Sequence, residues 1–170
     1  SVLLCVAFVN AQQQAYKDVL TGIPNRQAYE ERLSEEVARA RRYDSVLCMI
    51  VWDVDKFKNI NDSYGHAAGD RVLKVIAETL NDSIRETDFL ARFGGEEFVL
   101  LLPGTELEST RQVAEKLRKN IEETPFHFRD TNVTITVSGG IAQLQKDETT
   151  NSLFERADKA LYKAKENGRN

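Results

Sequence analysis

Apolar residues recur every three or four positions along much of the chain, which is the spacing that places them on one face of a helix. Four stretches show this pattern and are predicted to be helices: 25–43, 67–84, 107–122 and 152–166. Gly168 follows the last of them, as expected where a helix ends. A short helical turn is expected to reach Asn61.

The strands are predicted by apolar and β-branched runs between these helices. Residues 46–52 are apolar without interruption, which is typical of a strand covered on both faces, and we expect this strand to reach residue 54. The runs 88–93 and 98–102 flank Gly94-Gly95, a pair that favours a tight hairpin turn because its centre needs positive φ. Two further strands are expected at 126–128 and from 133 through 137 into Gly139-Gly140.

These elements together define the fold class. Helices and strands alternate along the chain, whereas the hairpin pairs two strands that are adjacent in sequence. The pattern therefore predicts an α/β (α+β) domain with a partly antiparallel sheet and flanking helices.

The first sixteen residues differ from the rest. Residues 1–9 are nearly all apolar and residues 10–14 are polar. Nine apolar residues are too few to span a bilayer, which needs about 20. We expect residues 1–16 to form the end of a signalling or stalk helix, followed by a folded domain over 17–170. Two alternatives stay open for the helix: the last turns of a transmembrane segment, or a coiled-coil stalk.

Composition limits the function classes. The chain has 170 residues, enough for one domain, with 41% apolar and 29% charged residues. Its net charge of −4 argues against a nucleic-acid surface, which should be basic. The two cysteines, Cys5 and Cys48, form neither a metal-binding spacing nor a disulfide framework. A reducing cytoplasm is therefore the expected location, with membrane attachment only through an upstream helix.

Acidic residues gather at the ends of predicted strands. Asp53 and Asp55 follow the apolar run, and residues two apart on a strand share a face. Glu96 and Glu97 follow the glycine pair. Brought side by side, these carboxylates could hold Mg²⁺, which prefers one or two carboxylates together with phosphate oxygens. Blander alternatives are an Asp that caps the next helix and a solvated glutamate turn.

Phosphate-binding features follow directly after the first acidic pair. Lys56 and Lys58 flank Phe57 at the start of the expected helical turn. Basic side chains and free backbone N–H groups at a helix start suit phosphate. The sequence thus places both halves of a metal–triphosphate site within a few residues.

The chain resembles the GGDEF domain family of diguanylate cyclases, with Gly-Gly-Glu-Glu-Phe at the signature position. The similarity covers roughly residues 17–170 and rests on motifs in family order: 18–26, 53–62, 64–70, 94–98, 138–141 and 157–170. The resemblance implies a five-stranded mixed sheet, similar to the palm of nucleotidyl cyclases and polymerases. It also implies an enzyme that condenses two GTP into cyclic di-GMP and releases two pyrophosphates.

The resemblance assigns metal ligands and catalytic groups. Asp53, the Val54 carbonyl and Glu96 would hold Mg²⁺, or Mn²⁺ in its place. Glu97 would be a further metal ligand or the base that takes the hydroxyl proton, and this choice stays open.

The resemblance also assigns the substrate contacts. Phosphates would meet Lys58, Lys165, Arg169 and the backbone N–H groups near Lys56 and Phe57. Guanine would be read by Asn61 and Asp70, with His66 near the nucleotide. Asp70 suits this role on chemical grounds, because a carboxylate accepts from the adjacent N1–H and N2–H₂ donors of guanine, which adenine lacks. The alternative for Asp70 is a surface charge on a helix.

The resemblance also implies a homodimer and inhibition by the product. One domain would hold one GTP, so turnover requires a homodimer. Five residues separate Asp88 of the motif Arg85-x-x-Asp88 from Gly94, which is the family spacing of a product site for cyclic di-GMP. A second arginine common in relatives is replaced by Lys116, which cannot make the same planar fork. A catalytically silent GGDEF domain that senses nucleotide or cyclic di-GMP is the alternative function.

Overall fold

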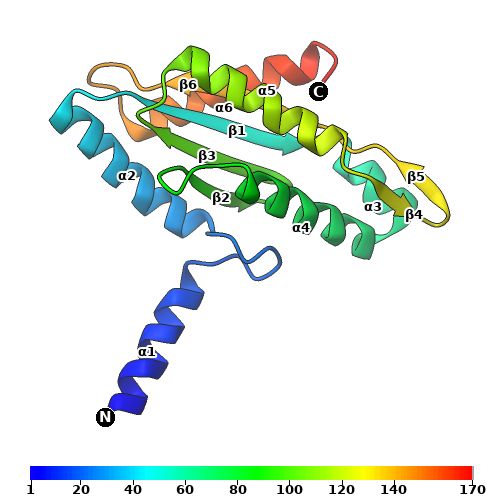
Figure 1. The fold of residues 1–170 in the computed structure, drawn as a ribbon, viewed down its shortest axis with the longest axis horizontal. Helices are drawn as coiled ribbons and strands as arrows, with labels where there is room; N and C mark the ends of the chain where they lie inside the picture. The colour runs from blue at the N-terminus through cyan, green and yellow to red at the C-terminus, as the bar shows by residue number, and fades with distance from the viewer. Residues whose placement is uncertain (170) are drawn as a thin grey trace.

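The computed structural model describes residues 1–169 and consists of a central sheet with helices on both faces (Figure 1). In chain order the elements are α1 (Val2–Ala15), α2 (Arg26–Tyr43), β1 (Leu47–Val54), α3 (Phe57–Tyr64), α4 (His66–Asp82), β2 (Phe89–Gly94), β3 (Glu97–Pro103), α5 (Leu107–Glu122), β4 (Phe126–Phe128), β5 (Thr131–Val133), β6 (Val137–Gln143) and α6 (Thr150–Glu166). The four longer helices predicted within the domain are all present, with ends shifted by at most two residues, and the short helical turn expected to reach Asn61 extends to Tyr64.

The sheet has four strands in the order β2-β3-β1-β6, and each neighbouring pair is antiparallel. The α/β class is confirmed, but the expectation of a five-stranded mixed sheet needs correction. The missing strand is β4, which pairs only with β5 in a separate two-stranded ribbon. This ribbon lies beside α3, where the Phe128 and Tyr64 rings are 5.6 Å apart.

The single strand expected from residue 133 to Gly140 is in fact two strands. Residues 134–136 between β5 and β6 belong to neither. The Thr136 carbonyl accepts a hydrogen bond from the Asp55 N–H at 2.9 Å, so this backbone pairs with the loop after β1. Alternating apolar side chains predicted the extended backbone correctly but could not show that its hydrogen bonds leave the sheet.

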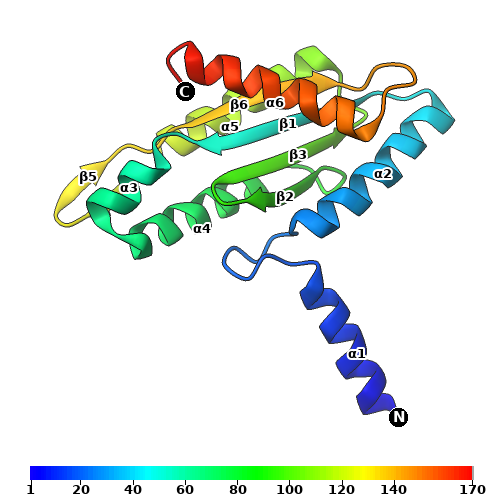
Figure 2. The ribbon, with the colours of Figure 1, turned by 180° about the vertical axis from the view of Figure 1, so that it is seen from behind.

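Two hydrophobic cores lie on opposite faces of the sheet. Helices α4 and α5 cover one face, and α2 and α6 cover the other (Figures 1 and 2). Strand β1 lies between them, and its apolar side chains are buried on both faces, as its uninterrupted apolar sequence predicts. On the α4 side the Trp52 ring packs over Gly139, where a Cβ atom would lie 2.7 Å from the ring.

Helix α6 approaches the sheet most closely at Gly140. A Cβ atom there would lie 2.1 Å from the Ala157 carbonyl oxygen and 2.2 Å from the Leu161 nitrogen. Only glycine permits this contact between helix backbone and strand. The contact brings the last turn of α6, with Lys165, over the end of β1.

Helix α1 projects away from the rest of the protein in both views (Figures 1 and 2). All of its residues are exposed, including Leu3 at 83% and Phe8 at 64% of their full accessibility. Over residues 1–169, none of the helices combines the length and the apolar character that crossing a bilayer demands. The domain boundary near residue 16 stays a prediction.

Candidate functional site

The two acidic segments meet at one edge of the sheet. Asp53 on β1 lies directly opposite Glu97 on β3 in the antiparallel register. The next residue, Val54, donates its N–H to the Glu96 carbonyl at 3.2 Å. Directly opposed residues have Cβ atoms about 4.5–5.5 Å apart and point to the same face. The sheet therefore brings together Asp53 and Glu97, which are 44 positions apart in sequence.

A lysine side chain lies over this edge. Lys165 Nζ is 2.8 Å from Asp53 Oδ1 and 3.4 Å from Asp55 Oδ1. The lysine comes from the last turn of α6, which the contact at Gly140 places there. Asp53 and Asp55 thus reach the same ammonium group, in agreement with the shared face expected from their spacing.

Asp55 is a buried carboxylate to which the family resemblance assigns no role. Its side chain is only 3% exposed. Thr136 Oγ1 donates to Asp55 Oδ2 and Ser138 Oγ donates to Asp55 Oδ1, each at 2.7 Å. The signal was present in the sequence as a second carboxylate after Asp53 and a small hydroxyl residue inside an apolar strand.

The site carries an excess of negative charge. Burial raises the pKa of Asp53, and the carboxylates of Glu96 and Asp55 raise it further, while Lys165 opposes them. Burial also raises the pKa of Glu97, with added repulsion from Asp53, Asp158 and Glu96. Both shifts show that negative charge is costly at this edge unless a cation is present.

The donor set fits a hard divalent cation. All the available donors are oxygens, which suits Mg²⁺ or Mn²⁺ better than a thiolate- or imidazole-binding ion. Within residues 1–169, His, Cys, Asp and Glu side chains form no group of three or more arranged to hold a metal. A metal here would therefore rely on few carboxylates, a backbone carbonyl, and oxygens from substrate and water, which is the pattern Mg²⁺ prefers.

The hairpin turn differs by one residue from the expected one. Gly94 pairs with Glu97, so Gly95 and Glu96 form the turn, and the register is irregular between Arg92 and Gly94. Gly95 has φ of +47°, whereas Gly94 is not in the left-handed region. The Arg92 guanidinium holds this turn by donating to the Gly95 carbonyl at 2.7 and 3.0 Å.

The start of α3 offers backbone donors to an anion. No side chain caps this helix, so the alternative in which an aspartate acts as its N-cap is not observed. Its N-cap residue Lys56 has φ of +54°, a conformation that costs a non-glycine residue about 1–2 kcal/mol. Such an outlier is typical of a functional loop. Lys58 is exposed in the first turn, and Phe57 is half-buried.

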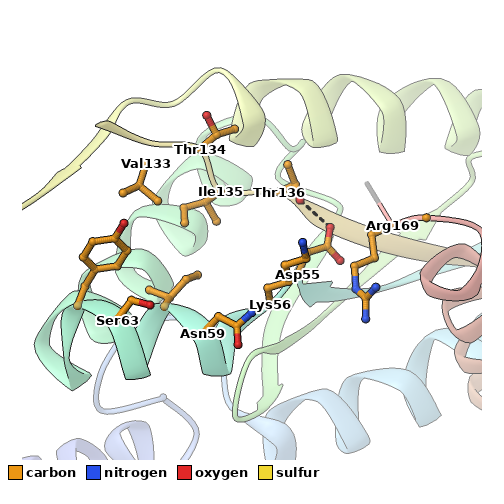
Figure 3. A pocket seen from close by; sticks show the side chains of 12 residues that line it. Asp55, Lys56, Asn59, Ser63, Val133, Thr134, Ile135, Thr136 and Arg169 are labelled. Atoms are coloured by element: carbon orange, nitrogen blue, oxygen red, sulfur yellow. Dashed lines mark hydrogen bonds between the residues drawn. The ribbon is translucent and has the colours of Figure 1, made fainter. Parts of the chain in front are cut away.

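A cavity of about 400 Å³ lies beside this loop (Figure 3). It is bounded by α3, by the segment 133–136 and by the end of the chain. Lys56 and Arg169 line it next to Asp55, so two predicted phosphate-binding residues share one cavity. Lys165 reaches Asp55 as well, which places both predicted cations of the C-terminal motif near the loop after β1.

The predicted guanine-binding residues lie where α3 meets α4. Gly69 permits a close approach of the two helices, because a Cβ atom there would lie 1.9 Å from Asn61 Oδ1. Asp70 follows Gly69 and is exposed. His66 is one turn earlier on the same face of α4 and is also exposed. The structure thus brings Asn61 beside the residue that precedes Asp70.

The predicted product site lies at the other end of β2. Arg85 Nη2 is 2.8 Å from Asp88 Oδ1, and the guanidinium also donates to the Pro103 carbonyl and to Thr105 Oγ1. Asp88 is 3% exposed beneath Arg85, which is 56% exposed. β2 has six residues, so about 20 Å separates this pair from the hairpin turn. Lys116 is exposed on α5.

Comparison with known proteins gives a consistent result. The profile of the family described as "Diguanylate cyclase, GGDEF domain" matches residues 15–170. Diguanylate cyclase DgcP of Pseudomonas aeruginosa is 53% identical over 158 residues, covering 93% of this chain and 24% of that protein. Diguanylate cyclase A of Treponema denticola is 37% identical over 174 residues, covering 99% of this chain and 47% of that protein. The chain therefore spans a quarter to a half of these relatives.

A solved structure agrees with these sequence comparisons. The coiled coil and GGDEF domain of DgcB from Caulobacter crescentus, in complex with c-di-GMP, superimposes with a TM-score of 0.94 at 32% identity. The match covers 98% of this chain and 88% of that one. The similarity thus extends over the described fold, helix α1 included.

Proposed function

The chain belongs to the GGDEF family, and on that premise we propose that it condenses two GTP molecules into cyclic di-GMP with release of two pyrophosphates. The observation that carries this proposal is the edge of the sheet where Asp53 faces Glu97 and Lys165 approaches Asp53 at 2.8 Å. The intact carboxylates favour an enzyme over a silent nucleotide sensor.

The carboxylates would promote attack of the 3′-hydroxyl on the α-phosphate, by holding a metal or by accepting the hydroxyl proton. Asp53, the Val54 carbonyl and Glu96 would hold Mg²⁺ or Mn²⁺, which would stabilise the attacking and leaving oxygens of an in-line displacement. Glu97 would either complete that ligand set or accept the hydroxyl proton. Its raised pKa makes Glu97 a stronger base than an ordinary glutamate, which suits the second role.

The remaining residues would orient the nucleotide. The uncapped start of α3 would bind phosphate through the N–H groups near Lys56 and Phe57, with Lys58, Lys165 and Arg169 neutralising charge. Asn61 and Asp70 would bind the guanine edge. His66 would lie near the nucleotide without acid–base work.

Two domains must face each other for turnover, because each would hold one GTP. Residues 1–16 would bring them together as a stalk, and 17–170 would form the catalytic domain. The exposed apolar side chains of α1 support pairing with the same helix of a second copy. Effective concentration then controls the rate.

Product inhibition is proposed for the pair Arg85 and Asp88, with Lys116 as a weaker third contact. Arg85 would bind a phosphate or a guanine edge, and Asp88 would accept from guanine. Asp88 is covered by Arg85, so cyclic di-GMP would have to take over the guanidinium from it. Arg85→Ala should raise the inhibition constant for cyclic di-GMP, and an unchanged constant contradicts the assignment.

The proposed reaction is tested by incubating the protein with GTP and Mg²⁺ and separating the products. One cyclic di-GMP should form for every two GTP consumed and two pyrophosphates released. The rate per domain should increase with protein concentration, because the active site is shared. Nucleotide binding without any product at high protein concentration would favour the silent sensor.

A further inference from the structure

Lys165 lies where its ammonium group competes with a metal for Asp53. Nζ is 2.8 Å from Asp53 Oδ1, the carboxylate that the proposed function gives to the metal. It is also 3.4 Å from Asp55 Oδ1. The two carboxylates differ in exposure, since the Asp53 side chain is 15% exposed and that of Asp55 only 3%.

The Asp55 carboxylate is fixed in its orientation. One oxygen accepts from Thr136 and the other from Ser138, both at 2.7 Å, and the Asp55 N–H donates to the Thr136 carbonyl. Turning outward would break both side-chain hydrogen bonds, and a buried acceptor without its donors is costly. Asp55 is thus an anion of fixed orientation beside Lys165, whereas Asp53 is the more exposed of the two carboxylates.

We propose that Asp55 is a positioning residue, which retains Lys165 beside the site when Asp53 is given up to the metal. The inference rests on the proposed function, which supplies the metal and the phosphates. Within residues 1–169, the ion-pair partners of Lys165 are Asp53 and Asp55. If Asp55 were removed, only Asp53 would remain. Lys165 would then hold Asp53 more firmly, and a metal would have to displace the ammonium group without another anion to receive it.

The arrangement links metal and nucleotide binding. Substrate phosphate draws Lys165 away from Asp53 and frees this carboxylate, so each ligand favours the other by the same factor. Asp55 shifts this balance through Lys165, because it keeps the lysine within reach of metal and substrate.

The test measures Mn²⁺ affinity without nucleotide, from the electron paramagnetic resonance signal of free Mn²⁺. Lys165→Met should bind Mn²⁺ about tenfold more tightly than wild type, and Asp55→Asn about tenfold more weakly, within the usual range of coupling. In the Lys165→Met background, Asp55→Asn should have little further effect. Asp158→Asn removes a charge near Glu97 without touching Lys165, and it should also have little effect.

Equal weakening by Asp55→Asn in both backgrounds would overturn the proposal, because Asp55 would then act by charge or folding alone. If Asp55→Asn does not fold, Lys165→Met decides, and unchanged Mn²⁺ affinity in that variant overturns the proposal. If neither wild type nor Lys165→Met binds Mn²⁺, both the proposal for Asp55 and the metal assignment are overturned. If the variants change Mn²⁺ affinity as expected but the chain makes no cyclic di-GMP, the proposal for Asp55 is supported and only the proposed function is contradicted.

Discussion

Asp18 and Arg92 form an ion pair that joins the segment before α2 to the signature turn. Arg92 Nη1 is 3.1 Å from Asp18 Oδ2, and both side chains are less than 20% exposed. Burial alone would raise the pKa of Asp18, but hydrogen bonds from Thr21 and the Arg92 guanidinium bring that pKa below its usual value. Because Arg92 also binds the Gly95 carbonyl, the pair anchors the turn that carries Glu96.

Asp18→Asn should therefore reduce turnover more than it reduces stability. We expect a loss of about 1–2 kcal/mol in the free energy of unfolding, measured with urea, from a partly buried charged hydrogen bond. The rate should fall at least about tenfold, since small displacements of catalytic groups are costly. Glu108→Gln, in an exposed pair with Arg111, is the matched control. A variant with wild-type turnover would show that the pair does not position the turn.

Glu148 and Arg156 provide a prediction on pH. Arg156 donates to both oxygens of Glu148, whose side chain is 5% exposed, and it brings the pKa of Glu148 down to about 2. A lowered pKa in the folded state contributes stability above the unfolded pKa of about 4.3, and this is lost as pH falls toward 2. Arg156→Gln should cost about 2 kcal/mol at pH 7, after allowing for screening of the partly exposed arginine.

The cost of Arg156→Gln should shrink steadily between pH 5 and pH 2, because Glu148 of the unfolded chain takes up its proton in this range, whereas the folded wild type takes it up only near pH 2. Chemical unfolding across that range measures it. A cost independent of pH would mean that Arg156 stabilises by packing alone. Arg111→Gln, in the exposed pair, should change little at any pH.

Glu97 provides a prediction of opposite sign. Its pKa is raised, so the charged form is disfavoured in the folded protein, and the cost disappears as pH falls through the folded pKa. Without divalent ions, Glu97→Gln should stabilise the domain at pH 8, on the order of 0.5–1 kcal/mol. The stability gained by Glu97→Gln should decrease as the pH is lowered. Equal or lower stability at pH 8 would contradict the charge excess.

The same variant distinguishes the two roles of Glu97 once Mg²⁺ is added. If Glu97 is a metal ligand, Mg²⁺ should raise the melting temperature of wild type more than that of Glu97→Gln. If it is the base, Mg²⁺ should stabilise both proteins alike, and only turnover should fall.

Asp70→Ala tests the reading of guanine. The residue is exposed on α4, so thermal stability should be almost unchanged. Affinity for a non-hydrolysable GTP analogue should fall by about 1–3 kcal/mol, because the guanine donors lose their acceptor. Calorimetry measures the affinities for the GTP and ATP analogues, and Asp62→Ala on α3 serves as the control. Unchanged affinity would place guanine recognition elsewhere.

The sequence predicted the elements well because each carries its own periodicity. The buried strand β1 and the four amphipathic helices needed no tertiary information, and the spacing of Asp53 and Asp55 predicted their shared face. What the sequence could not predict were contacts between distant segments. The Asp55 N–H donates to the Thr136 carbonyl where the continuous strand was expected, and Arg92 donates to the Gly95 carbonyl at the turn that lies one residue from the expected one.

The missed role of Asp55 has the same origin. Its partners Thr136, Ser138 and Lys165 lie 81 or more residues away and are brought together only by β6 and α6. The seating of α6 depends in turn on Gly140. The position of Gly140 in the predicted strand gave no indication that a helix backbone packs against this residue.

The proposed reaction depends on a metal held at the Asp53 carboxylate. The most direct test is the yield of cyclic di-GMP from GTP by wild type and Asp53→Asn at saturating Mg²⁺, with circular dichroism to show that both are folded. Wild type should form cyclic di-GMP and pyrophosphate, and Asp53→Asn should form essentially none, because the ligand that holds the Lewis acid is lost. Near-normal cyclic di-GMP formation by folded Asp53→Asn would contradict the account.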